Sequence, residues 1–189
     1  NRSDIYEDIP DTKENFNYQV AATTKLLQFS AAEQMYVSDC EADDVIGYLA
    51  KNLLEEDIII ASSDKDFYQL LGPRVKMYSP TKKRFITHED VREEHDISSV
   101  NFATARSFVG DNSDNICGIR GVGLKTLAKR FPALRNDDFV SCDDIIKLCR
   151  EVPEAKRIKL HKNVLASESI VKRNWKLMYL DTSNLSADQ

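Results

Sequence analysis

The sequence predicts an α/β fold built around a parallel sheet, on three observations. Ile58–Ala61 is an uninterrupted apolar run, which is typical of a strand buried on both faces of such a sheet. Asp64 and Asp66 follow this run, at the end of the strand where open α/β sheets bind their ligands. Apolar residues recur at helical spacing over 16–27 and 45–54, which predicts helices to cover the sheet.

Composition places the chain among ordinary globular proteins. Of its 189 residues, 42% are hydrophobic and 30% are charged, and no apolar run approaches the roughly 18 residues of a membrane helix. No signal peptide is visible, so we expect a cytoplasmic protein, in a bacterium or a phage-infected host, with no membrane partner. The chain opens on Asn1 instead of Met, which suggests a piece of a longer protein.

The formal net charge of −5 is unevenly distributed along the chain. Residues 1–114 carry 12 basic against 22 acidic residues, and residues 115–189 carry 14 against 9. An acidic half joined to a basic half suits a metal-dependent enzyme that acts on a polyanion. Accidental clustering of charged residues on solvated faces would produce the same charge distribution.

Cysteines and histidines offer no zinc site. The four cysteines are scattered without a C-x-x-C pair, and the three histidines lack ligand spacing near them. We expect reduced core thiols.

The first half of the chain predicts one element after another. Residues 1–12 are polar and form an arm, after which Asp11 or Thr12 caps the helix over 16–27. Met35–Val37 is predicted as a short strand. Ser38 and Glu41 then form a capping box for the helix over 45–54, which leads to the strand Ile58–Ala61.

The elements predicted after this strand are two strands and then a series of helices, with turn and cap residues between them. They are strands over 74–78 and 83–86, short helices over 87–95 and 102–109, a stop at Gly110, and an amphipathic helix over 143–149 that Pro153 ends.

Acidic residues gather in three places, after two predicted strands and after the 102–109 helix. They are Glu41, Asp43, Asp44, Asp64, Asp66, Asp111 and Asp114. A solvated loop with Asp64 as a helix cap explains part of this pattern, but seven carboxylates in one pocket cannot all ionise without cations. Oxygen ligands alone select Mg²⁺ or Mn²⁺, and two such ions support phosphodiester hydrolysis. An EF-hand is excluded by Ile116 and Val122 at its glycine and glutamate positions.

A glycine turn follows the third acidic group. Gly121 and Gly123 permit a tight turn between two short helices and close approach of backbone N–H groups to a phosphate. Lys125, Lys129 and Arg130 add positive charge, which favours a grip on a nucleic-acid backbone. The basic runs over 156–162 and 172–176 are equally consistent with a solvated face.

Three motifs now identify a resemblance. They are Glu41-Ala42-Asp43-Asp44-Val45-Ile46, Ser63-Asp64-Lys65-Asp66-Phe67-Tyr68-Gln69-Leu70, and the run from Gly110 to Thr126. In this order and spacing they resemble the flap endonuclease / 5′→3′ exonuclease family, including the 5′-nuclease domain of bacterial DNA polymerase I and stand-alone bacteriophage enzymes. The likeness covers roughly residues 15–130, and the tail around Trp175 looks more phage-like.

The resemblance implies a PIN-like α/β/α sandwich with a mostly parallel sheet over 1–110, and a helix-hairpin-helix DNA-binding region over 111–189, in one compact unit. It implies catalytic roles for Asp64, Asp66, Asp114, Glu41 and Asp43, with Asp44 and Asp111 as further metal-site residues. It also implies two Mg²⁺ or Mn²⁺ ions and, in some members, a K⁺ at the hairpin. The residues implied to bind DNA are Gly118, Gly121, Val122, Gly123, Lys125, Thr126 and Lys129.

The implied function is cleavage of 5′ flaps or 5′ ends of DNA in replication or repair, by a monomer that works with replication proteins. Family members begin with two acidic strands and a basic helical arch, and this chain starts just after the arch. We therefore expect the isolated chain to bind DNA weakly and to cleave it slowly or not at all.

Two other interpretations stay open at this point. A non-catalytic DNA-binding fragment would keep the hairpin without cleaving. A haloacid-dehalogenase-like phosphatase also ends a strand in Asp-x-Asp, but that family expects Thr or Val where Tyr68 stands, and it leaves the glycine turn unexplained.

Overall fold

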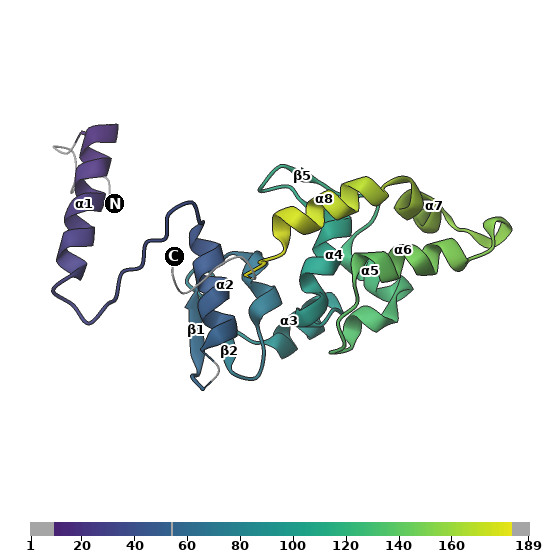
Figure 1. The fold of residues 1–189 in the computed structure, drawn as a ribbon, viewed down its shortest axis with the longest axis horizontal. Coiled ribbons are helices and arrows are strands. Elements are labelled where there is room, and N and C mark those ends of the chain that lie inside the picture. Colours follow the sequence, from purple (N-terminus) through teal and green to yellow (C-terminus); the bar gives the residue numbers. More distant parts are fainter. Residues whose placement is uncertain (1–9, 54, 183–189) are drawn as a thin grey trace. The chain divides into compact units, whose positions relative to one another are not determined.

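A computed structural model describes residues 10–53 and 55–182, and it divides the chain into two units, Asn1–Asp39 and Cys40–Gln189 (Figure 1). The polar arm predicted over 1–12 lies mostly outside the described residues. Residue 110, where the sequence predicts a boundary between regions, lies inside the second unit. No helix in the described part of the chain is both long and apolar enough to cross a bilayer.

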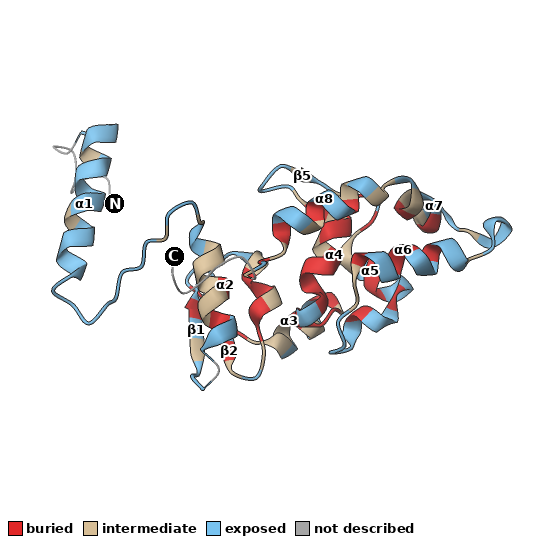
Figure 2. Cartoon of the chain, in the orientation of Figure 1, coloured by how far each residue is buried: buried red, intermediate tan, exposed pale blue. Residues whose placement is uncertain are grey.

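The first unit holds one helix, α1 (Lys13–Leu27), which begins at the predicted cap. The Thr12 hydroxyl accepts a hydrogen bond from the backbone N–H of Asn15 at 3.2 Å. No residue of α1 is buried, so its predicted apolar stripe covers no core (Figure 2). The strand predicted over Met35–Val37 is wrong: these residues form no ladder with any described strand, and Met35 and Tyr36 are exposed.

Helix α2 (Ala42–Asn52) opens the second unit, and its cap differs from the predicted one. Glu41, and not Ser38, is the N-cap, and it forms the capping box with Asp44. The Asp44 carboxylate accepts from the backbone N–H of Glu41 at 3.2 Å. Asp39 has a positive φ of 59° in the turn before the helix, so helical geometry begins only after this turn.

A sheet of three strands follows, in the order β1-β2-β3. β1 (Ile58–Ala61) pairs in parallel with β2 (Val75–Ser79), and β3 (Arg84–Ile86) returns antiparallel to β2. The three described strands of this sheet thus form one parallel and one antiparallel pair, so the predicted mostly parallel character is not seen. The 3₁₀ helix η2 (Lys65–Leu70) lies in the crossover between β1 and β2.

Only one face of this sheet is buried. Register places Ile60, Met77 and Ile86 on the buried face, whereas Ile59 and Phe85 project from the other face and are 59% and 51% exposed. The prediction that Ile58–Ala61 is buried on both faces is therefore wrong for the described chain. An apolar run marks residues able to be buried, but neighbouring elements decide whether both faces are covered.

The rest of the second unit is helical, with one small hairpin between helices. Its elements are α3 (His88–His95), η3 (Ser99–Asn101), α4 (Phe102–Val109), β4 (Gly110–Asp111), β5 (Ile116–Cys117), α5 (Leu124–Arg130), η4 (Pro132–Arg135), α6 (Cys142–Glu151), η5 (Glu154–Lys156), α7 (Lys159–Ala166) and α8 (Glu168–Met178). The short helix predicted before Gly121 is wrong: the strand β5 precedes the turn, paired with β4.

Helix α4 is the centre of this region. It packs along α8 and also contacts α5 and η2, so it joins the sheet to the C-terminal helices (Figures 1 and 2). Phe102, Ala105 and Phe108 are almost completely buried on it. Asn174 of α8, fully buried, donates to the carbonyl oxygens of Ser107 at 3.0 Å and Cys117 at 2.9 Å. These bonds fix β5 and the end of α4 against α8.

Candidate functional site

The loop after β1 places two carboxylates at the carboxyl end of the strand, as predicted. The Asp64 carboxylate accepts from the backbone N–H of Asp66 at 2.9 Å, so Asp64 is also the N-cap of η2. Asp64 is exposed, whereas Asp66 is partly buried. Asp64 therefore caps the helix η2 and also places a negative charge at the end of β1.

The β4–β5 hairpin brings the third acidic group to the same place. Gly110 has a φ of +79°, and a Cβ there would overlap the backbone nitrogen of Gly118. Only glycine fits this crossing of the two strands. Asp111 follows, and its carboxylate accepts from the backbone N–H of Ser113 at 2.9 Å, which folds the turn that carries Asp114.

Three of the predicted carboxylates meet. Asp66, Asp111 and Asp114 each offer an oxygen, and these oxygens all lie within 4.8 Å of one another. Asp111 and Asp114 border a hollow of about 330 Å³ that Asp64, Lys65 and Arg106 also line. Residues that are far apart in the chain thus form one acidic site.

Electrostatics in this site follow from burial and crowding. Burial raises the pKa of Asp66, and the charges of Asp64 and Asp114 act in the same direction, while Arg106 opposes them. Burial, followed by the charge of Asp64, also raises the pKa of Asp43. Asp43 is therefore close enough to the cluster to feel its field.

The remaining two predicted residues have local partners. Glu41 and Asp44 hold each other's backbone N–H groups in the capping box of α2, on the same helix end as Asp43. The structure thus brings Asp66, Asp111 and Asp114 together, puts Asp64 on the wall of the hollow, and engages Glu41 and Asp44 in the helix start.

Sequence reasoning missed Arg106. Its guanidinium pairs with Asp111 and approaches the Asp66 carboxylate at 3.4 Å, and its side chain is 12% exposed. The sequence does contain a signal that could have identified Arg106, since it is the only charged residue among the apolar and small residues of α4. A buried arginine almost always pairs with an acidic group.

The donor set fits a divalent metal ion. Three carboxylates converge from separate elements, no sulfur or imidazole ligand stands among them, and a buried guanidinium already compensates part of their charge. Hard oxygen donors of this kind suit Mg²⁺ or Mn²⁺. Burial raises the pKa of the Cys142 thiol to about 12 and that of the Cys149 thiol to about 11, which disfavours the thiolate form at these two positions.

All four cysteines are free, as predicted, but only Cys142 and Cys149 are core residues. Cys117 is exposed, and Cys40 is partly exposed.

The glycine turn forms a surface next to the hairpin. Lys125, Thr126 and Lys129 lie on α5 and are exposed, and the helix begins directly after the turn, with Gly123 as its N-cap. Gly121 has a φ of +79° and Gly123 has open space around it, so the backbone is accessible at both positions. Two other residues predicted to bind DNA contribute to packing instead of to the surface. The Val122 side chain is buried, and a Cβ at Gly118 would overlap the carbonyl oxygen of Val109.

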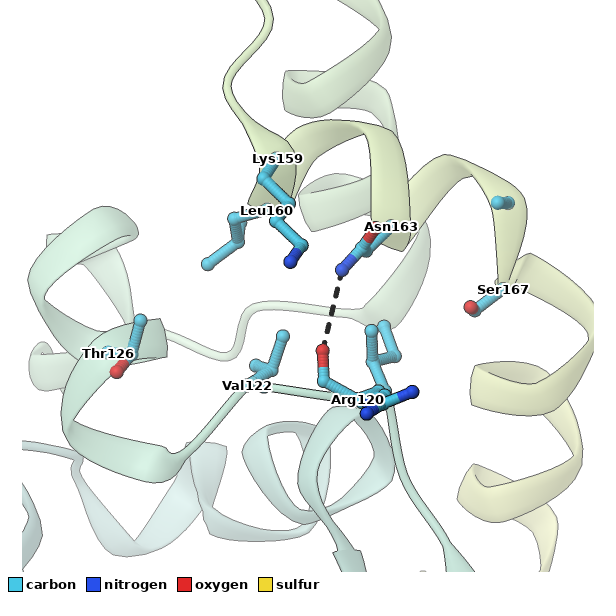
Figure 3. A pocket seen from close by; sticks show the side chains of 10 residues that line it. Arg120, Val122, Thr126, Lys159, Leu160, Asn163 and Ser167 are labelled. Atoms are coloured by element: carbon cyan, nitrogen blue, oxygen red, sulfur yellow. Dashed lines mark hydrogen bonds between the residues drawn. The ribbon is translucent and has the colours of Figure 1, made fainter.

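A second hollow, of about 710 Å³, lies between this turn and α7 (Figure 3). Arg120 and Val122 line it from the turn, and Lys159 and Asn163 line it from α7. The Asn163 amide donates to the Arg120 carbonyl oxygen at 3.4 Å. Two basic side chains thus border a depression beside the accessible backbone.

Comparison with known proteins gives consistent matches. A family model described as "5′-3′ exonuclease, N-terminal resolvase-like domain" matches residues 2–96. The thermostable DNA polymerase I of Thermus filiformis is 33% identical over 156 residues, which are 81% of this chain and 18% of that protein. A 5′-3′ exonuclease of Buchnera aphidicola is 32% identical over 123 residues, covering 62% of this chain and 43% of that protein.

Solved structures agree with these sequence matches. The flap endonuclease of bacteriophage T5, in a pseudo-enzyme-product complex with DNA and metal ions, aligns with a TM-score of 0.72 at 25% identity. The alignment covers 95% of this chain and 65% of that one. The chain therefore spans about a fifth to somewhat under half of these two curated relatives and about two thirds of this solved neighbour.

Proposed function

We infer that this chain, which belongs to the 5′-3′ exonuclease family, supplies the metal site and the DNA-binding surface of a nuclease that cleaves DNA at 5′ ends or 5′ flaps. The observation that carries the proposal is the convergence of Asp66, Asp111 and Asp114 within 4.8 Å. Membership in this family disfavours the phosphatase interpretation, which would use the first aspartate as a nucleophile.

The acidic hollow would hold two Mg²⁺ or Mn²⁺ ions. Asp66, Asp111 and Asp114 would provide the central ligands, and Asp64, which lines the hollow, would add a further one. Asp43, whose pKa is raised by burial and then by the charge of Asp64, is proposed as an additional member of the set. Bound ions of this kind activate a water and stabilise the leaving oxygen of a phosphodiester. Lys65 lines the same hollow and would hold the scissile phosphate by its charge.

The surface around the glycine turn would bind the DNA backbone. Lys125 and Lys129 lie on α5 beside accessible backbone. Arg120 and Lys159 add basic side chains at the second hollow (Figure 3). Contacts of this type position DNA without reading its sequence. The T5 relative's complex with DNA and metal ions supports both parts of the proposal.

The decisive experiment is a double substitution, Asp64→Asn with Asp66→Asn, in the native protein that contains this chain. Cleavage of a 5′-flap DNA with Mg²⁺ should be lost while DNA binding persists, because metal ligands disappear and the basic surface stays. Asp143→Asn is the matched control, since Asp143 is an exposed carboxylate paired with Lys172 outside the hollow. Near-normal cleavage by the double variant would show that these aspartates are dispensable.

A second experiment tests the DNA-binding surface. Lys125→Ala should weaken duplex binding to a similar extent for unrelated sequences and should lower the salt slope of binding by about one. Equilibrium titrations at several salt concentrations measure that slope. A loss confined to one DNA sequence would contradict backbone contact, and binding without any cleavage by the native protein would favour the non-catalytic alternative.

A further inference from the structure

Arg106 is a buried cation in the middle of the acidic site. It lies on α4, one turn before Gly110, and its side chain is 12% exposed. Neighbouring residues of α4 are apolar or small and mostly buried. Burying a guanidinium in such surroundings is costly unless carboxylates compensate its charge. The acidic hollow supplies that compensation.

The contacts of Arg106 are with two of the carboxylates proposed to bind metal. Its Nη2 atom pairs with Oδ2 of Asp111 and approaches Oδ1 of Asp66 at 3.4 Å. The side chains of Asp111 and Asp66 are themselves only 12% and 18% exposed. The Nε atom of Arg106 is buried and has no hydrogen-bond partner among the described residues. The carboxylates are therefore the contacts that hold the guanidinium in place.

A guanidinium and a divalent ion cannot both use these oxygens freely. Each requires carboxylate lone pairs, and two cations a few ångströms apart repel each other strongly in a partly buried site. Without Arg106, the negative charges of Asp66, Asp111 and Asp114 would lie close together with no positive charge between them. A cation on the protein itself reduces that repulsion before any metal binds.

We propose that Arg106 is an internal counter-ion of the metal site, which holds Asp66 and Asp111 together without metal and must leave at least one of them when a divalent ion binds. This inference rests on the proposed function, because it takes the acidic hollow as the metal site. Metal binding is then an exchange of one cation for another. Arg106 thereby sets how tightly the site holds its ions.

A different role for Arg106 would change metal affinity in the opposite direction when the arginine is removed. If Arg106 were a clamp that arranges the carboxylates for metal, its removal would weaken metal binding. As a counter-ion, its removal strengthens metal binding and weakens the metal-free fold. The sign of the change in metal affinity therefore separates the two roles without any activity measurement.

The experiment compares Mn²⁺ binding to the 189-residue chain and to Arg106→Met by titration calorimetry, without DNA. Methionine keeps an unbranched apolar side chain in a largely apolar helix and removes the charge. We expect the variant to bind Mn²⁺ at least about tenfold more tightly, because the competing cation is gone. Arg150→Met is the matched control: it removes an arginine from a 2.6 Å pair with Glu168 outside the hollow and should leave Mn²⁺ affinity unchanged.

Thermal melts provide the second measurement. In EDTA, Arg106→Met should melt below the wild type, since buried carboxylates lose their counter-ion. With saturating Mn²⁺ the deficit should shrink or reverse, because tighter binding stabilises the folded state more. Should Arg106→Met fail to fold without metal, Arg106→Lys decides the question: its shorter side chain spans the two carboxylates less well, so its Mn²⁺ affinity should rise by less.

Equal or weaker Mn²⁺ binding by the folded Arg106 variants would overturn the counter-ion role. Asp66→Asn distinguishes this failure from failure of the proposed function. If Asp66→Asn abolishes Mn²⁺ binding while the Arg106 variants bind like wild type, the metal site stands and the counter-ion inference falls. If neither the wild type nor the Arg106 variants bind Mn²⁺, the metal site fails and the inference fails with it.

Discussion

At the scale of single residues, glycines near the hairpin have separable roles. Gly118 lies against the end of α4, where a Cβ would overlap the Val109 carbonyl oxygen. Gly123 has a φ of −116°, and no described atom lies within 4 Å of the position that a Cβ would take there. The same residue type thus serves packing at one position and leaves a surface open at the other.

We predict that Gly118→Ala lowers the free energy of unfolding by more than about 3 kcal/mol, because backbone must shift to admit the methyl. Gly123→Ala should change it by less than about 0.5 kcal/mol. Urea denaturation of both variants measures the difference. Equal stabilities would contradict the close crossing of Gly118 with Val109. Gly123 is also a better position than Gly121 for a substitution that probes DNA contact, because the φ of +79° at Gly121 strains any side chain there.

His95 provides a pH-dependent prediction at the same scale. The imidazole is 9% exposed beside the rings of Tyr68 and Phe102, and burial lowers its pKa from the ordinary value of 6.5. Glu94 opposes this shift, while nearby lysines (Lys65, Lys82 and Lys125) reinforce it. The folded protein therefore keeps His95 neutral to a lower pH than the unfolded chain does.

Unfolding consequently takes up a proton as the pH falls below 6.5, and the free energy of unfolding decreases until the pH passes the folded pKa. Well above pH 6.5 the histidine is neutral in both states and contributes no slope. We predict that His95→Gln flattens the loss of stability between about pH 7.5 and about pH 5.5. Urea titrations at both ends of that range test this; identical slopes for variant and wild type would refute it.

At the scale of elements, the acidic hairpin depends on α8. Asn174 donates to carbonyl oxygens at the end of α4 and at β5, and thereby ties both ends of the segment that carries Asp111 and Asp114. Its neighbours on α8 pack against the core, whereas the Asn174 amide holds the hairpin in place through its two hydrogen bonds. The hairpin itself has only two residues in each strand and has little stability of its own.

We predict that Asn174→Ala lowers the free energy of unfolding by about 2–4 kcal/mol, since two carbonyl oxygens lose a buried donor. Metal affinity should fall as well, because Asp111 and Asp114 lose their placement. Asn163→Ala is the control: its single 3.4 Å bond to Arg120 is long and lies on a surface, so the change should stay below about 0.5 kcal/mol. Chemical denaturation and calorimetric titration with Mn²⁺ measure the two effects. A neutral Asn174→Ala would remove α8 from the support of the site.

Most element positions follow from local sequence signals, and the misplaced ones show where such signals end. Thr87 with Asp90, and Gly110 after α4, act locally, so the predicted start of α3 and end of α4 are confirmed. The cap of α2 lies at Glu41 and not at Ser38, because the turn at Asp39 decides which residue first takes helical geometry. Met35–Val37 could form a strand only with a neighbouring strand to pair with, and the local sequence does not show whether such a neighbour exists.

At the scale of the whole molecule, the two units differ in how they are stabilised. Helix α1 has a satisfied cap but no buried residue, and Phe16, Tyr18 and Leu26 are exposed on it. A helix of 15 residues that buries none of them is marginal in water by itself. The core lies in the unit Cys40–Gln189.

We therefore predict that the chain 40–189 melts within about 2 °C of the full chain, with one cooperative transition. Circular dichroism of both forms should show a lower helical signal in the truncated chain and the same midpoint. A midpoint lowered by many degrees would mean that residues 1–39 contribute to the core. Binding of Mn²⁺ should also survive the truncation, since every residue proposed to hold metal lies in the second unit.

Residue types and their local order are enough to predict the three acidic groups and most of the elements of this protein. Carboxylates without sulfur or imidazole partners select hard divalent ions wherever they meet, and caps and apolar spacing act within a few residues of chain. Which carboxylates meet depends on packing, because the convergence of Asp66 with Asp111 and Asp114 requires α4 and α8 to seat the hairpin near η2. Packing also makes Arg106 their counter-ion, since burial of a charge is a property of the packed core and not of the residues beside it in the chain.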